Sequence, residues 1–135
     1  MLQTRFDRYS SKYCIEQFEK NAPSIINEEA IIAFELDGED FEIYMPAISG
    51  EPDQDSLRIA REVMAHISEF DNLVQQSNAS ECERTGLDPR NYDLYLAYIT
   101  ISKPDIKLTY YGYRVNTEWD AIFNKNSGEW KKVNF

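Results

Sequence analysis

The strongest constraint on the fold is a pair of alternating apolar and polar runs that flank Asp37-Gly38. Residues 30–36 and 41–45 keep a period of two, which is the pattern of half-buried strands. An Asp-Gly pair tolerates the positive φ angles of a tight hairpin turn. We therefore predict a β-hairpin over residues 30–48. One face would carry Ile32, Phe34, Leu36, Phe41, Ile43 and Met45, and the other Ala33, Glu35, Asp40, Glu42 and Tyr44.

A helical period follows the hairpin. Residues 53–77 begin with the cap candidates Asp53 to Ser56, and acidic residues suit the positive end of the helix dipole. One apolar stripe then runs along the segment, formed by Ile59, Ala60, Val63, Met64, Ile67, Phe70 and Val74. This is the pattern of a helix that packs on a sheet.

Four further strand-like runs occupy residues 92–102, 106–115, 118–124 and 129–135, after a polar loop over residues 77–90. The first run is apolar on both faces, as a central strand is. Its period of two places Leu94, Leu96 and Tyr98 on one face, opposite Tyr95, Ala97, Ile99 and Ile101.

The chain is therefore predicted to be one α+β domain over residues 1–135. It would contain a single antiparallel sheet of about six strands, made of the hairpin and a four-stranded meander, with one long helix packed on one face. Residues 1–29 would form an N-terminal helix or a docked arm.

The acidic residues are unevenly distributed. Ten carboxylates and no Lys or Arg lie between Ala22 and Leu57, in a chain of net charge -10. Such self-repulsion is easiest to understand if a cationic partner faces it. A pI of about 4.5 argues against binding to nucleic acid or to an anionic membrane. Two other interpretations stay open: a solvated face that only aids solubility, and cation binding at residues 37–40 or 53–55, although neither segment has the spacing of a calcium loop.

The tyrosines give a second candidate surface. A helix about 10 Å wide cannot cover six strands spaced about 4.8 Å apart. Part of the sheet is therefore left for the N-terminal arm, for a second subunit in a homodimer, or for a partner protein. Aromatic residues are enriched where partners dock, although core packing accounts for tyrosines equally well. The predicted partner-binding residues are Glu35, Asp37, Glu39, Asp40, Glu42, Tyr44, Tyr95, Tyr111 and Tyr113.

No catalytic, metal-binding or cofactor-binding residue is predicted. His66 is the only histidine, and we expect it to be partly buried and hydrogen-bonded. Cys14 and Cys82 suit two reduced thiols in a cytoplasmic protein, with one disulfide as the alternative. The first eight residues contain Arg5, Asp7 and Arg8 rather than the apolar run of a signal peptide.

The segment from Leu108 to Phe123 resembles one found in small bacterial proteins, some of which are similar to immunity proteins of polymorphic toxin systems. The resemblance covers about the last third of the chain and depends on Tyr110, Gly112, Asn116, Thr117 and Trp119. These residues also suit an ordinary turn and core. The resemblance implies a protein that binds and blocks a cognate toxin, and it assigns no functional residue.

Together, the sequence favours a non-enzymatic protein-binding domain of the immunity type. Its acidic face would neutralise a basic toxin, such as a nuclease, by imitating the charge of the toxin's substrate. The alternative is an interaction or structural domain whose acidity only keeps it soluble.

Overall fold

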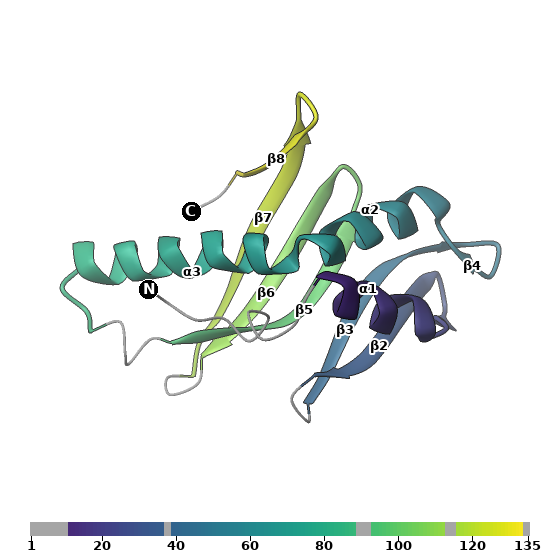
Figure 1. Ribbon diagram of the computed structural model, residues 1–135, viewed down its shortest axis with the longest axis horizontal. Coiled ribbons are helices and arrows are strands. Elements are labelled where there is room, and N and C mark those ends of the chain that lie inside the picture. The colour runs from purple at the N-terminus through teal and green to yellow at the C-terminus, as the bar shows by residue number, and fades with distance from the viewer. Residues whose placement is uncertain (1–10, 37–38, 89–92, 113–115, 134–135) are drawn as a thin grey trace.

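The computed structural model describes residues 11–36, 39–88, 93–112 and 116–133 (Figure 1). The elements are α1 (Ser11–Lys20), β1 (Ser24–Ile26), β2 (Glu29–Leu36), β3 (Glu39–Ile48), β4 (Glu51–Pro52), α2 (Gln54–Ala65), α3 (Ile67–Arg84), β5 (Leu94–Ser102), β6 (Asp105–Gly112), β7 (Glu118–Asn126) and β8 (Glu129–Lys132). The predicted α+β class and the single sheet with helices are confirmed.

The sheet has eight strands rather than about six. Its order is β1-β2-β3-β5-β6-β7-β8, and β4 pairs with β3. The two strands that the sequence did not predict, β1 and β4, have only three and two residues. So short a strand carries too few residues to display a period.

The sheet is mixed and not wholly antiparallel, because β3 and β5 run parallel. The reason lies in the connection between them. After β3, helices α2 and α3 carry the chain back across the sheet. Strand β5 therefore starts at the same end of the sheet as β3 and runs in the same direction. Every other strand pair is antiparallel, including the predicted hairpin, in which Phe34 lies opposite Phe41.

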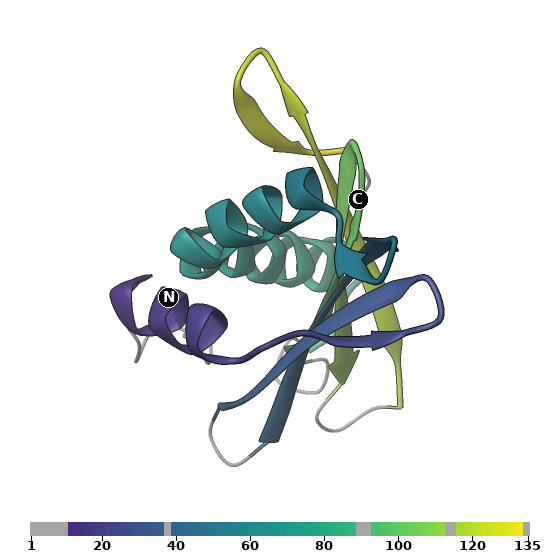
Figure 2. The ribbon, with the colours of Figure 1, turned by 90° about the vertical axis from the view of Figure 1, so that its right-hand side faces the viewer.

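The helices of the described residues, α1, α2 and α3, lie on one side of the sheet (Figure 2). The single predicted helix is in fact two, because the backbone at His66 leaves the helical conformation with φ -129° and ψ 26°. Its N–H bonds to the carbonyl of Val63, three residues back, which tightens the last turn of α2. The apolar stripe nevertheless continues across the break, since Met64 and Ile67 are both buried.

Helix α3 continues to Arg84, through residues that the sequence indicated as loop. Cys82, in this last part, is buried, and its Sγ lies 3.9 Å from Asn78 Oδ1 one turn earlier on the same helix. Gly86, at φ +77°, then ends the helix. The N–H of Leu87 bonds to the carbonyl of Cys82 at 2.8 Å, and that of Gly86 to Glu83 at 3.2 Å. These two bonds form a Schellman cap, which satisfies carbonyls at the end of the helix.

The core lies between the helices and the sheet. The predicted inward residues of the hairpin are buried, except that the side chain of Leu36 lies outside the described part. One polar cluster sits inside this core: the hydroxyl of Tyr110 donates to Asp71 Oδ1 at 2.6 Å, and Gln75 Nε2 donates to the carbonyl of Leu94 at 2.8 Å. Apolar contacts lie beside this cluster, and Phe70 packs edge-on against Phe123 with ring centroids 5.0 Å apart.

A β-bulge in β5 changes which face each residue occupies. The register with β6 shifts between Leu96 and Tyr98, which leaves Ala97 as the extra residue. Leu96 and Ile99 are therefore both buried, whereas strict alternation placed Ile99 on the opposite face. Tyr98 moves to the face of Tyr95, which corrects the predicted arrangement of this strand.

A candidate docking surface on the helix-free face

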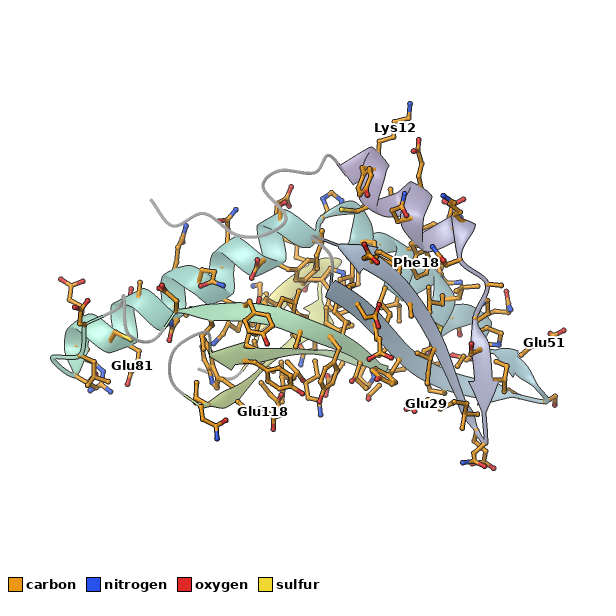
Figure 3. All side chains as sticks on the ribbon, turned by 90° about the horizontal axis from the view of Figure 1, so that it is seen from below. Lys12, Phe18, Glu29, Glu51, Glu81 and Glu118 are labelled. Carbon is orange, nitrogen blue, oxygen red and sulfur yellow. The ribbon has the colours of Figure 1, made fainter. Side chains whose placement is uncertain are left out.

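The face of the sheet away from the helices is the candidate site. Each strand sends alternate side chains to this side, and Glu29 and Glu118 mark it in Figure 3. None of α1, α2 and α3 covers this face (Figure 2). The N-terminal arm was one of three covers that the sequence left open, and its helix α1 packs on the other face, with Cys14 and Phe18 in the core. As far as the described residues go, the middle of the sheet is open to a partner on this side.

Four tyrosines form a continuous row across three strands of this face. Tyr44 of β3 contacts Tyr98 of β5, with ring centroids 5.5 Å apart. Tyr98 contacts Tyr111 of β6 at 6.2 Å, and Tyr111 contacts Tyr95 at 6.1 Å. Each contact is edge to face, the geometry that aromatic quadrupoles favour. All four side chains are half-buried, so the row is ordered and still accessible.

The row borders a shallow depression of about 290 Å³. It is lined by Asp40, Glu42, Tyr44, Tyr95, Ala97, Tyr98 and Tyr111. The parallel pairing of β3 with β5 explains this composition, because it places Glu42 opposite Tyr98. Carboxylates of the hairpin and tyrosines of the meander, remote in sequence, are thereby brought into one site.

Most of the predicted partner-binding residues with described side chains meet in this depression: Asp40, Glu42, Tyr44, Tyr95 and Tyr111. Glu35 lies opposite Asp40 and is exposed, outside the lining. Asp37, Tyr113 and the side chain of Glu39 lie outside the described part of the chain.

Tyr98 was missed by the sequence interpretation. Its strand is apolar on both sides, so no alternation in the sequence reveals the bulge that turns this ring outward.

The hydroxyls of Tyr44 and Tyr111 keep their protons at neutral pH. Burial, a hydrogen bond to Glu42 and the charges of Glu42 and Glu29 raise the pKa of Tyr44 to about 12. Burial, followed by Tyr98 and Glu118, also raises the pKa of Tyr111. The hydroxyl of Tyr44 donates to Glu42 Oε1 at 2.9 Å, which orients that carboxylate. The site therefore combines neutral aromatic rings with carboxylate groups.

Exposed aliphatic residues extend the surface beyond the tyrosine row. Ile48 lies on the same side of β3 as Tyr44, and Ile26 is paired with Glu29. They are 61% and 57% exposed, which is unusual for isoleucine. Aromatic residues are enriched at protein interfaces, whose centres are more apolar than their polar rims.

The acidic run divides into two parts in the fold. Asp53 caps α2 by accepting from the N–H and the hydroxyl of Ser56, and Lys103 Nζ lies 2.9 Å from Asp53 Oδ2. Asp55 pairs with Arg58 at 2.9 Å. These two acids have cations from outside the run. Of the hairpin acids with described side chains, Glu29, Glu35, Asp40 and Glu42 lie on the helix-free face of the sheet.

A second groove, of about 460 Å³, lies at the break between α2 and α3. It is lined by Glu62, His66, Glu69, Phe70, Leu73, Gly128, Glu129 and Trp130. His66 is exposed rather than partly buried, because the break turns it to solvent, and its Nδ1 lies 3.4 Å from Glu69 Oε1. Lys125 Nζ and Trp130 Nε1 both donate to Glu62, so this carboxylate joins β7 and β8 to α2.

Both cysteines are free and buried, and neither lines the groove beside His66. Within residues 11–36, 39–88, 93–112 and 116–133, no three His, Cys, Asp or Glu side chains form a group able to hold a metal ion. Over the same ranges, none of the helices has both the length and the apolar character needed to span a membrane.

The residues of the C-terminal resemblance are mainly structural in the described chain. Tyr110 is buried, and Trp119 packs against the core. The N–H of Gly112 bonds to the carbonyl of Thr117 at 3.1 Å. Comparisons with protein-family models, with curated proteins and with solved structures found no match to this chain.

Proposed function

We propose that this chain is a non-enzymatic protein-binding domain that acts as an immunity protein, neutralising a basic cognate toxin. The observation that supports this most directly is the depression on the helix-free face. There the carboxylates of Asp40 and Glu42 adjoin the rings of Tyr44 and Tyr98.

The two kinds of side chain suit two steps of binding. Carboxylates attract a basic partner from a distance and speed its association. Tyrosine rings then provide contact area at a low cost in side-chain entropy, which favours a long-lived complex. A toxin held in this way would present its basic surface to the acidic face and could not bind an anionic substrate there.

A second interpretation is an interaction or structural domain in which the acids only maintain solubility. The exposure of Glu35 and Glu29 favours it, because exposed carboxylates are well solvated without any partner. The two interpretations differ in what the hairpin charges do to the rate of partner association.

The experiment uses the full chain to capture its partner from the native host and then measures the association rate. Replacing Glu35, Asp40 and Glu42 with Lys is expected to slow association most strongly at low salt. The matched control replaces the helix residues Glu16, Glu69 and Glu83 with Lys, an equal change in net charge at exposed positions.

The difference between these variants should shrink with added salt, since the screening length falls from about 30 Å at 0.01 M to about 8 Å at 0.15 M. Equal association rates for the two variants at every salt concentration would contradict the proposal, as would a captured partner that is itself acidic.

A further inference from the structure

We propose that the depression beside the tyrosine row binds a guanidinium group, supplied by an arginine side chain of the partner protein. This inference rests on the proposed function and names the chemistry of its contact. It follows from the carboxylates, the ring geometry and the size of the depression.

Two carboxylates stand on the same side of one strand. Asp40 and Glu42 are two residues apart on β3, so their backbone positions are roughly 7 Å apart. The hydroxyl of Tyr44 engages Glu42 Oε1 and so fixes the position of that group. A guanidinium carries five N–H donors in a planar fork and can bond to carboxylate and phenol oxygens together. An ammonium offers three donors from one point.

The rings provide a surface for a flat cation. Neighbouring rings of the row meet at interplanar angles of 76°, 73° and 83°. Such edge-to-face contacts cover less of each ring than parallel stacking does. Guanidinium stacks on aromatic faces and is weakly hydrated, whereas an ammonium is compact and strongly hydrated. The geometry therefore favours arginine over lysine.

The size of the depression suits one side chain. Its volume of about 290 Å³ lies just below the range of roughly 300–1,000 Å³ that is usual for small-molecule pockets. Among the described residues that line it, none is a Lys or Arg. Elsewhere in the described chain, acids such as Asp53 and Glu62 already hold Lys103 and Lys125. The lining carboxylates are thus placed for a cation that the partner brings.

The test uses the full chain and three short peptides blocked at both ends, Gly-Gly-X-Gly-Gly, in which X is arginine, lysine or citrulline. Binding is followed by NMR titration, with the ring signals of Tyr44 and Tyr98 as reporters. The arginine peptide is expected to bind about ten-fold more tightly than the lysine peptide. Citrulline, which has a similar shape without the charge, is expected to cause no shift of these signals.

Variants locate the contact. Glu42→Gln and Tyr98→Leu should each abolish the preference for arginine, and Asp40→Asn serves if either fails to fold. Glu35→Gln is the matched control, because it removes one charge from the same hairpin outside the depression. If the Glu42→Gln and Tyr98→Leu variants still prefer the arginine peptide to the lysine peptide, the proposed guanidinium site is wrong.

The results also separate this inference from the proposed function. Equal binding of the arginine and lysine peptides would overturn the guanidinium site. If the association rate of a captured basic partner still depended on the hairpin charges, the docking function would stand without the guanidinium site. Loss of the dependence on hairpin charges would remove the docking function, whatever the peptides do.

Discussion

Tyr110 and Tyr111 are neighbours on one strand, yet they belong to two different regions of the molecule. Tyr110 faces the helices, is 0% exposed and donates its hydroxyl to the buried Asp71. Tyr111 faces the other way and is half-buried within the tyrosine row. The abundance of tyrosine alone therefore says nothing about docking. The face that a ring occupies decides whether it stabilises the fold or is available to a partner.

The largest expected difference between the two faces is in stability. Phe70→Ala should lower the free energy of unfolding by on the order of 3–5 kcal/mol, because it removes a buried ring and leaves a cavity. Phe70 packs on Phe123 and Trp130. Urea unfolding measures the loss, and Tyr111→Ala on the open face is the comparison, for which a much smaller loss is expected. Similar losses for the two variants would show that both faces act as core.

A sharper comparison removes one hydroxyl from each of the neighbouring tyrosines. Tyr110→Phe leaves Asp71 without the hydrogen bond that it accepts at 2.6 Å, so unfolding should become easier by about 1–3 kcal/mol. Tyr111→Phe removes a hydroxyl from the accessible row and should change stability little. The urea midpoints of the two variants, each compared with that of the wild type, test this prediction. A reversed order would mean that the polar cluster in the core contributes nothing.

The smallest expected effect is on the pH dependence of stability. It distinguishes an acid that stabilises the fold from the acids of the open face. Hydrogen bonds from Lys103 and then Ser56 lower the pKa of Asp53 from 3.8 to about 2. Since the folded state holds this group's proton less tightly than the unfolded state, its contribution to stability is fully present above pH 3.8. It is lost as the pH falls towards 2.

The unfolding midpoint of Asp53→Asn should therefore lie below that of the wild type at neutral pH and approach it as the pH falls through this window. Glu35→Gln, on the open face, is the control. A constant gap between Asp53→Asn and the wild type across this pH range would contradict the role of Asp53.

The hairpin could be predicted from the sequence because its two faces differ so clearly in polarity. The same holds for the apolar stripe of residues 59–74, whose buried face continues through the break at His66. The break itself could not be predicted, because residues 65–67 include neither Pro nor Gly. The end of α3 had a signal in Gly86, which the sequence interpretation took as part of a loop.

The candidate site could be predicted only in part. Alternation placed Asp40, Glu42 and Tyr44 together on the polar face of the hairpin, and Tyr95 and Tyr111 were among the predicted partner-binding residues. The outward orientation of Tyr98 depends on a bulge, and a strand that is apolar on both faces has no sequence pattern that indicates one. The meeting of the two groups also depends on parallel pairing, which is decided by how the helices return the chain and not by the strands' own residues.

The parallel pairing of β3 with β5 has a consequence for when the site exists. Three residue pairs join these strands, and both α2 and α3 lie between them in the chain. We expect contacts across so long a connection to form late in folding, because the loss of chain entropy precedes the gain in contacts. Asp40, Glu42 and Tyr44 stand on one side of this junction, and Tyr95, Tyr98 and Tyr111 on the other. A nascent or truncated chain would present only half of the surface, so a partner that docks there as proposed would bind only the fully folded chain.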